Sequence, residues 1–391
     1  MLSFYGAQLD GCNILLSIFI GLFLCVVKPG MLIAFTFLGG LVFLIVGAEL
    51  LVRGASRLAA FLGIAPLVIG LTVVAFGTSS PELAVSLISS LRGSADIALG
   101  NVVGSNIFNI LFILGISAAI RPLLISIQLI RIDVPLMILV SALLFLFGLN
   151  GVLEQLESGI LFVGLISYII FLFLEAKKEK LITGIKPAAD HSEKQQKNLF
   201  QWVINVGFII FGLILLILGS QFLVNSAVVL AQKLGISELV IGLTIIAAGT
   251  SLPEVATSVM ASIKGEQDIA VGNIIGSNIF NILAVLGLSG LVSSGGIQIS
   301  TAALRFDIPV MLAISVACLP IFFTDGKISR WEGFLFFGYY LAYVVYLLLL
   351  STHHDAAPLY SIIFQLFIIP LTAVTLLVLL IQAVRRKKSK E

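Results

Sequence analysis

The chain has 391 residues, of which 59% are hydrophobic and only 11% are charged, with a formal net charge of +2. Soluble globular domains carry about 25% charged residues, so this composition excludes a protein whose whole surface faces water. Several stretches reach the roughly 20 apolar residues that a helix needs to cross a bilayer, and none shows the short alternating pattern of a transmembrane β-strand. The composition therefore predicts an all-α polytopic membrane protein, and the small net charge gives no reason to expect a nucleic-acid partner.

Apolar stretches run the length of the chain. The first, near 12–28, lacks a preceding basic segment and a following cleavage site, so we interpret it as a transmembrane helix and not as a removed signal peptide. The next five predicted spans lie near 32–62, 66–91, 97–120, 132–149 and 158–175. After a polar, basic linker, five more lie near 202–233, 238–263, 269–293, 304–324 and 331–351. A last apolar stretch, near 359–384, precedes the basic tail RRKKSKE.

The two groups of five spans are copies of one another. Residues 70–117 align with residues 242–289 without a gap, and more than half of the aligned positions are identical. We therefore divide the chain into an extra N-terminal transmembrane helix, a first repeat, a cytoplasmic basic linker, a second repeat, and an extra C-terminal transmembrane helix with a basic tail. These segments are expected at 1–31, 32–175, 176–201, 202–351 and 352–391.

The basic residues predict the orientation of the two repeats. The linker and the C-terminal tail are the two basic blocks of the chain, and both are expected to face the cytoplasm, because positively charged segments next to transmembrane helices are retained there. Both chain termini are then cytoplasmic. Equivalent helices are five crossings apart, an odd number, so the two five-helix repeats are predicted to have inverted topology. Inverted repeats are typical of secondary transporters, which bind their substrate near the midplane between the repeats.

Two helix breaks are predicted inside the spans. The strings AFGTSSPE at 75–82 and AAGTSLPE at 247–254 occupy equivalent positions in the second span of each repeat. Pro81 and Pro253 each remove a helical hydrogen-bond donor and clash with the carbonyl one turn earlier, so the helix is expected to break or kink just before the glutamate that follows. A backbone carbonyl released in the membrane needs a partner, and a dehydrated cation would supply one.

Glu82 and Glu254 are the most informative residues of these breaks. A charged side chain at membrane depth costs about 2.5–3.5 kcal/mol on insertion scales, so a pair of glutamates at equivalent positions favours a functional role over a purely structural kink. The neighbouring side chains offer hydroxyl oxygens, with no cysteine or histidine nearby, which favours a hard cation. Glu49 is left out of this site, because Arg53 is well placed to pair with it four residues later.

The span after each break carries a second set of polar side chains. The strings GNVVGSNIFNIL at 100–111 and GNIIGSNIFNIL at 272–283 place three of them four residues apart, hence on one helix face. In the first repeat they are Asn101, Ser105 and Asn109, and in the second they are Asn273, Ser277 and Asn281. Glycines in the same strings would let neighbouring helices approach closely.

The paired GTSSPE and GTSLPE motifs, each followed by GNxxGSNIFNIL, resemble the α-repeats of the sodium/calcium exchanger family of calcium/cation antiporters, in its short prokaryotic form. The resemblance covers residues 32–351 and implies ion sites between the second and third helices of two inverted halves. It implies as ion ligands the carboxylates of Glu82 and Glu254, the carbonyls of Ala75 and Ala247, the hydroxyls of Thr78, Ser79, Ser105, Thr250, Ser251 and Ser277, and the side chains of Asn109 and Asn281. Family members often have an aspartate at one of the last two positions, so one titratable group of the family pattern is missing here.

We therefore predict a secondary active antiporter of the prokaryotic cell (inner) membrane that exchanges sodium for calcium at Glu82 and Glu254. The alternatives are a proton/calcium or potassium-dependent sodium/calcium exchanger, and a cation channel built from rings of oxygens. An enzyme is not expected, because no histidine lies in a predicted span to act as a base. Calcium and sodium ions and the lipid bilayer are the expected partners. No cofactor and no protein partner is implied.

Overall fold

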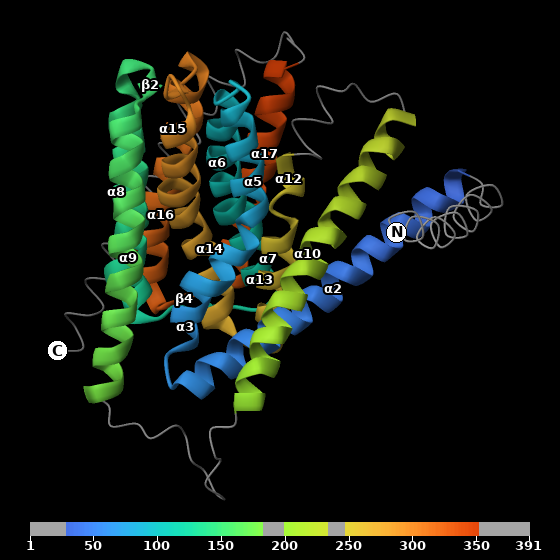
Figure 1. The fold of residues 1–391 in the computed structure, drawn as a ribbon, viewed down its shortest axis with the longest axis vertical. Helices are drawn as coiled ribbons and strands as arrows, with labels where there is room; N and C mark the ends of the chain where they lie inside the picture. Colours follow the sequence, from blue (N-terminus) through green and yellow to red (C-terminus); the bar gives the residue numbers. More distant parts are fainter. Residues whose placement is uncertain (1–28, 183–198, 234–246, 352–391) are drawn as a thin grey trace, which may run out of the picture.

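A computed structural model describes residues 29–182, 199–233 and 247–351, which form a bundle of helices (Figure 1). Within these residues, eight helices are long and apolar enough to cross a membrane, or nine if the bent pair Pro66–Thr78 and Ser80–Leu91 counts as one span. The prediction of a helical, multi-pass membrane protein is therefore confirmed, with four short strands in addition to the helices. The predicted spans near 12–28 and 359–384, and the first part of the span near 238–263, lie outside the described residues.

The helices follow the predicted spans closely. Those before the linker are α2 (Pro29–Leu62), α3 (Pro66–Ile69), η1 (Gly70–Val74), α4 (Ala75–Thr78), α5 (Ser80–Leu91), α6 (Asp96–Phe108), η2 (Asn109–Leu114), α7 (Gly115–Ile120), η3 (Leu129–Asp133), α8 (Val134–Phe147), η4 (Gly148–Asn150) and α9 (Gln155–Ile182). Those after it are α10 (Leu199–Lys233), α12 (Ala247–Gly249), α13 (Leu252–Lys264), α14 (Gln267–Phe280), η6 (Asn281–Leu286), α15 (Gly287–Val292), η7 (Ala303–Asp307), α16 (Ile308–Asp325) and α17 (Arg330–Ser351). Helix α9 continues past the expected start of the linker at residue 176.

The centre of the bundle is formed by the helices that follow the two breaks. The most apolar stretch of the span Gln267–Val292 is completely buried and that of Asp96–Ile120 is 72% buried, whereas only 28% of the corresponding stretch of Gln155–Lys177 is buried. Outer helices expose large apolar side chains, such as Val163 and Phe173 on α9. A helix that is apolar on all sides suits a bilayer, so lipid surrounds the outer helices, while α6 and α14 are enclosed by protein.

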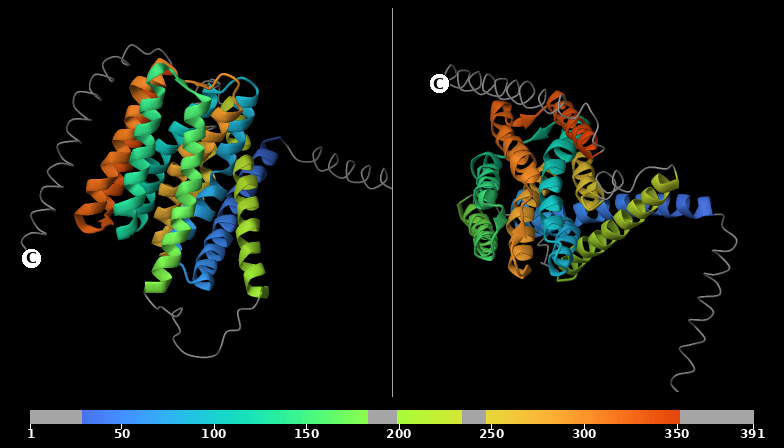
Figure 2. Two further views of the ribbon diagram at one scale, coloured as in Figure 1. Left: turned by 60° about the vertical axis from the view of Figure 1, so that its left-hand side comes forward. Right: turned by 90° about the horizontal axis from the view of Figure 1, so that it is seen from above.

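Helices α2 and α10 lie alongside each other at one edge of the bundle (Figures 1 and 2). Their contact is made through glycines. A Cβ atom added to Gly47 would lie 2.8 Å from the carbonyl oxygen of Gly212, and one added to Gly212 would lie 2.8 Å from the carbonyl oxygen of Gly47. Gly40 and Gly219 face each other in the same way. Small residues allow such close backbone approach between membrane helices, so these glycines set the distance between α2 and α10.

Two short strand pairs connect the loops at the helix ends. Strand β1 (Leu123–Leu124) pairs with β4 (Lys327–Ile328), and β2 (Val152–Leu153) pairs with β3 (Ile297–Gln298), both antiparallel. Gly296, which precedes β3, has φ 71° and would bring an added Cβ within 2.5 Å of the Leu153 carbonyl oxygen. Only glycine fits such a position without strain. Each pair joins a segment before the linker to a segment after it.

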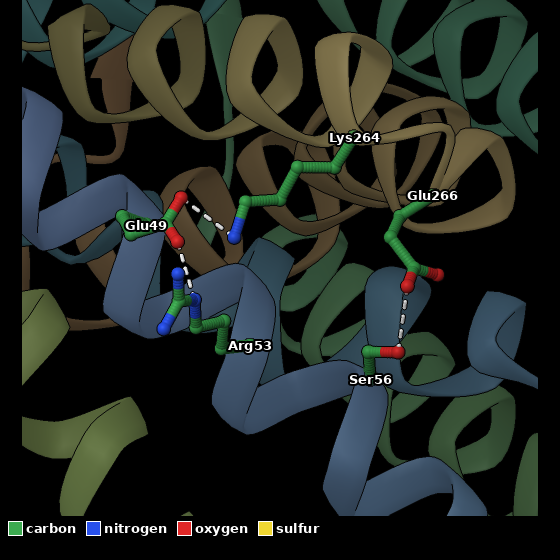
Figure 3. A network of polar contacts seen from close by, with 5 residues as sticks. All are labelled: Glu49, Arg53, Ser56, Lys264 and Glu266. Atoms are coloured by element: carbon green, nitrogen blue, oxygen red, sulfur yellow. Dashed lines mark hydrogen bonds and ion pairs between the residues drawn. The ribbon is translucent and has the colours of Figure 1, made fainter.

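A network of charged residues joins α2 to the end of α13 (Figure 3). Glu49 forms the predicted ion pair with Arg53, and Lys264 Nζ lies 2.6 Å from the second carboxylate oxygen of Glu49. One helical turn further along α2, Ser56 Oγ donates a hydrogen bond of 2.8 Å to Glu266 Oε1. The exclusion of Glu49 from the site is consistent with this arrangement, because its charge is balanced by two cations.

This network predicts unequal effects of two substitutions on stability. Glu49→Gln leaves Arg53 and Lys264 without their anion, so we expect it to lower the free energy of unfolding by about 1 kcal/mol. Lys264→Met leaves the carboxylate paired with Arg53, so we expect a loss of less than about 0.5 kcal/mol. Unfolding of the purified variants in detergent measures both values. If Lys264→Met lowered the free energy of unfolding as much as Glu49→Gln, Arg53 would contribute nothing to the neutralisation of Glu49.

Candidate cation site

Both predicted helix breaks are present in the structure. Helix α4 ends at Thr78 and α5 begins at Ser80, with a bend of 45° between the two segments. Ser79 between them has φ −79° and ψ 6°, and Ser251, between α12 and α13, has φ −90° and ψ 9°. Pro81 and Pro253 follow in the first turn of the next helix, where proline is well tolerated. The prolines therefore begin a new helix instead of kinking an old one.

The two glutamates lie in the first turns of α5 and α13 and are fully buried. Glu82 is 0% exposed and Glu254 is 1% exposed. Ser251 Oγ donates a hydrogen bond of 2.8 Å to Glu82 Oε1, and Ser79 Oγ donates one of 3.1 Å to Glu254 Oε1. Each break serine thus binds the glutamate of the other break. The helix N-terminus favours a negative charge at both positions.

The threonines of the two breaks also reach across. Thr78 Oγ1 donates to Asn273 Oδ1 at 3.0 Å, and Thr250 Oγ1 donates to Asn101 Oδ1 at 3.5 Å. The backbone N–H of Ser79 donates a hydrogen bond of 3.0 Å to the carbonyl oxygen of Ala75, and Thr78 Oγ1 lies 3.3 Å from the same oxygen as an alternative acceptor for its one hydrogen. The Ala75 carbonyl therefore already accepts at least one hydrogen bond.

In the second break, the structure gives a hydrogen-bond partner for one backbone carbonyl oxygen, that of Gly249. The carbonyl of Gly249 lies one turn before Pro253, and Ser220 Oγ on α10 donates a hydrogen bond of 2.5 Å to this oxygen. A hydroxyl is therefore one partner of this carbonyl. Ala247 is the first described residue of α12.

The predicted serines of the following helices are also buried. Ser105 Oγ, on α6, lies 3.1 Å from Ser251 Oγ, next to Glu82. Ser277, the equivalent residue on α14, is 0% exposed, and its hydroxyl has no hydrogen-bond partner among the described residues. The polar face of α6, which the four-residue spacing predicts, thus reaches the second break through Ser105.

Four asparagines form a layer in which α6 and η2 meet α14 and η6. Asn281 Nδ2 donates to Asn106 Oδ1 at 3.0 Å, and Asn109 Nδ2 donates to Asn278 Oδ1 at 3.4 Å. Asn109 and Asn281 each begin a π-helical segment, a rare geometry that is frequent at functional sites. Asn106 and Asn278 were not predicted as part of the site, although the string GSN that contains them occurs in both repeats.

Several buried oxygens at this place have no hydrogen-bond partner among the described residues. They are Glu82 Oε2, Glu254 Oε2, Asn109 Oδ1, Asn281 Oδ1 and Ser277 Oγ. A buried polar atom without a partner is costly, and a buried carboxylate more so. All five are oxygens, the ligand type of calcium and sodium-like hard cations. The described residues contain no cluster of three or more His, Cys, Asp or Glu side chains, so the donor set does not suit a soft metal.

The fold and this site define a class of protein: a multi-pass helical membrane protein that encloses two carboxylates and several free oxygens at interrupted helices. Comparison with known proteins specifies the family. A family model described as "Sodium/calcium exchanger protein" matches residues 32–174 and 204–349. The chain therefore belongs to the sodium/calcium exchanger family, whose members are transporters.

Several prokaryotic relatives match this chain over nearly their whole length. The protein CaxA of Alkalimonas amylolytica is 43% identical over 318 residues, which cover 80% of this chain and 98% of CaxA. The sodium/calcium exchanger MaX1 of Methanosarcina acetivorans is 37% identical over 338 residues, covering 79% of this chain and 96% of MaX1. A solved structure of the sodium-calcium exchanger NCX_Mj has a TM-score of 0.68 and 31% identity, covering 80% of this chain and 98% of that one. The predicted family is confirmed, and the protein is a membrane antiporter.

Proposed function

We propose that this antiporter exchanges sodium for calcium at a site near the membrane midplane that Glu82 and Glu254 build together. The observation that carries the proposal is the pair of fully buried carboxylates, each with one oxygen bound by the other break's serine and one oxygen without a partner. One divalent cation balances two carboxylates. The unpartnered side-chain oxygens of Asn109, Asn281 and Ser277 would extend the coordination of the same ion.

The contacts also support two inverted repeats, at 32–175 and 202–351. With the alignment offset of the two copies, Gly40 is equivalent to Gly212 and Gly47 to Gly219. Gly40 contacts Gly219, which is the equivalent of Gly47, and Gly47 contacts Gly212, which is the equivalent of Gly40. The serine–glutamate and threonine–asparagine contacts of the two breaks are reciprocal in the same way: each contact recurs when both residues are replaced by their equivalents in the other repeat. Reciprocal contacts of this kind are what a two-fold axis between the halves produces.

Charge neutralisation explains why the transport of sodium is coupled to the transport of calcium. Without a cation, two buried carboxylates carry two negative charges, which opposes any rearrangement that moves the site through the apolar interior. Sodium ions or a calcium ion remove that charge. The site therefore changes its side of access when it is occupied by either ion, and this couples the outward movement of one to the inward movement of the other.

Calcium uptake into proteoliposomes tests this function. The full chain is reconstituted with sodium inside and diluted into sodium-free buffer that contains labelled calcium. Sodium-driven uptake is expected, and it should collapse when an ionophore dissipates the sodium gradient. Uptake that follows a pH gradient and ignores sodium would establish a proton/calcium exchanger, and a requirement for potassium would establish the potassium-dependent type. Calcium flux that needs no counter-ion would establish a channel.

The cross-break hydrogen bonds predict the effect of removing one hydroxyl. Ser251→Ala takes away the donor to Glu82 Oε1 and a polar neighbour of Ser105, so we expect the apparent KM for calcium to rise about tenfold. Ser80→Ala is the matched control, because Ser80 Oγ bonds only to the Phe76 carbonyl of its own span. Its KM should stay close to the value of the unmodified protein. Equal changes in both variants would contradict the assigned role of Ser251.

The orientation in the membrane is part of the proposal. The linker at 176–201 and the tail after residue 384 carry the two basic blocks of the chain, and both are placed in the cytoplasm of a prokaryotic cell with the protein in the inner membrane. Reporter fusions at the two chain ends and within the linker test this. All three should report the cytoplasmic side, and a periplasmic signal from any of them would overturn the topology.

A further inference from the structure

In the asparagine layer between the two halves, the backbone carbonyl of Asn278 fixes which way the side-chain amides of Asn106 and Asn281 are turned. We propose that Asn106 is a positioning residue that turns the side-chain amide of Asn281 so that its carbonyl oxygen, and not its NH₂ group, faces the transported cation. The inference rests on the proposed function, since it concerns the ligands of the same site. It assigns a role to a residue that lies outside the set of expected ligands.

The amide of Asn106 is anchored at its nitrogen. Asn106 Nδ2 lies 3.2 Å from the backbone carbonyl oxygen of Asn278 and 3.6 Å from Met311 Sδ. Both of these atoms are acceptors only. The NH₂ group of Asn106 must therefore face them, and its Oδ1 must point the opposite way. Asn106 is 1% exposed, so its amide is shielded from bulk solvent.

The orientation of Asn106 determines that of Asn281. Asn106 Oδ1 can only accept a hydrogen bond, and Asn281 Nδ2 donates to it at 3.0 Å. Because an amide carries its oxygen and nitrogen on opposite sides, Asn281 Oδ1 is then directed away from Asn106. It is buried and has no partner among the described residues, like the hydroxyl of Ser277 one turn earlier. A flipped amide would present two N–H donors to a cation, which no cation tolerates as ligands.

The equivalent contact in the other half lacks this anchor. Asn109 Nδ2 lies 3.4 Å from Asn278 Oδ1, a longer distance than that between Asn281 and Asn106. The side-chain nitrogen of Asn278 has no hydrogen-bond partner among the described residues, so this amide is held only at its oxygen, by the longer contact from Asn109. Asn106 and Asn278 are thus matched in residue type and in burial, and differ in whether the amide is fixed.

The test uses four forms of the full chain in proteoliposomes and measures the apparent KM for calcium and the maximal rate. Asn106→Leu removes the acceptor for Asn281, and we expect the KM to rise about tenfold while the maximal rate per folded transporter stays within about threefold. Asn278→Leu is the control with the same change in volume and burial, and its KM should rise at most about threefold. Gel filtration and thermal unfolding give the folded fraction of each variant.

The Asn281→Asp background separates orientation from packing. A carboxylate has an oxygen on both sides, so it directs an oxygen at the cation in either orientation of the side chain. In this background Asn106 Oδ1 has no donor at position 281, so Asn106→Leu removes no hydrogen bond and we expect it not to raise the KM. A tenfold effect that persists in this background, or equal effects of Asn106→Leu and Asn278→Leu, would overturn the inference, because either result indicates a packing defect. An unchanged KM in Asn106→Leu overturns it as well.

These outcomes remain distinct from a failure of the proposed function. If the unmodified chain shows sodium-driven calcium uptake and Asn106→Leu leaves the KM unchanged, only the role of Asn106 is lost. If the unmodified chain shows no sodium-dependent calcium uptake, the proposed function fails and the inference fails with it.

Discussion

Replacing Glu254 with glutamine is expected to reduce sodium-driven calcium uptake at least about 100-fold, which corresponds to about 2.8 kcal/mol. Glu82→Gln should have an effect of the same size. Glutamine keeps the volume and one oxygen but removes one of the two negative charges, so a bound calcium ion is left with an unbalanced positive charge in a buried place. A charge without a counter-charge is expensive there.

Glu49→Gln is the control for these two substitutions. Glu49 also lies within a span, but it is neutralised by Arg53 and Lys264 instead of facing free oxygens. We expect its uptake, normalised to the amount of folded protein, to stay within about threefold of the unmodified protein. Uptake by Glu82→Gln or Glu254→Gln at the level of this control would exclude the buried pair as the ion site.

Replacing Gly47 with leucine is expected to lower the free energy of unfolding by about 3 kcal/mol. The first atom of any side chain at Gly47 meets the backbone of Gly212 and Leu216, at 2.8 and 2.9 Å. A backbone carbonyl cannot rotate away as a side chain can, so α2 and α10 must separate. The loss is measured by unfolding of the purified protein in detergent and by its yield as a monodisperse species.

Gly39 provides the matched control for Gly47. It lies on the same helix, and an added Cβ would have nothing within 4 Å. Gly39→Leu should therefore change the free energy of unfolding by less than about 0.5 kcal/mol. If the two variants unfold alike, the close approach of α2 and α10 is not what stabilises this edge of the bundle.

The spans and the breaks were predictable because they depend on short pieces of sequence. Bilayer thickness fixes how long an apolar helix must be, and the predicted spans 97–120 and 269–293 match Asp96–Ile120 and Gln267–Val292 to within a few residues. Proline acts on its own helix, so the breaks near Ser79 and Ser251 could be placed from the two copies of the motif.

The pairing of side chains across the site was not predictable in the same way. The spacing within the first motif placed the hydroxyl of Ser79 near Glu82, but its hydrogen-bond partner is Glu254, which is 175 positions away. Helical periodicity says which residues share a face and not which face of another helix they meet. The exchange of partners between the breaks follows only from the arrangement of the two halves in space.

Asn106 and Lys264 were missed for two different reasons. Asn106 lies outside the four-residue spacing that groups Asn101, Ser105 and Asn109, so a search along one helix face passes over it. Lys264 pairs with Glu49 across a long stretch of chain, whereas the local pair of Glu49 with Arg53 follows from their spacing alone. The repeated string GSN was the one available signal for Asn106.

The two small strand pairs have a consequence for how the molecule is held together. Each pair takes one strand from residues 29–182 and the other from residues 199–351. The ladder bonds, the glycine contacts and the asparagine layer therefore all cross between these two parts without using the peptide bonds between residues 182 and 199. A gene divided at that place should yield two polypeptides that assemble into one molecule, and neither piece should be found folded without the other.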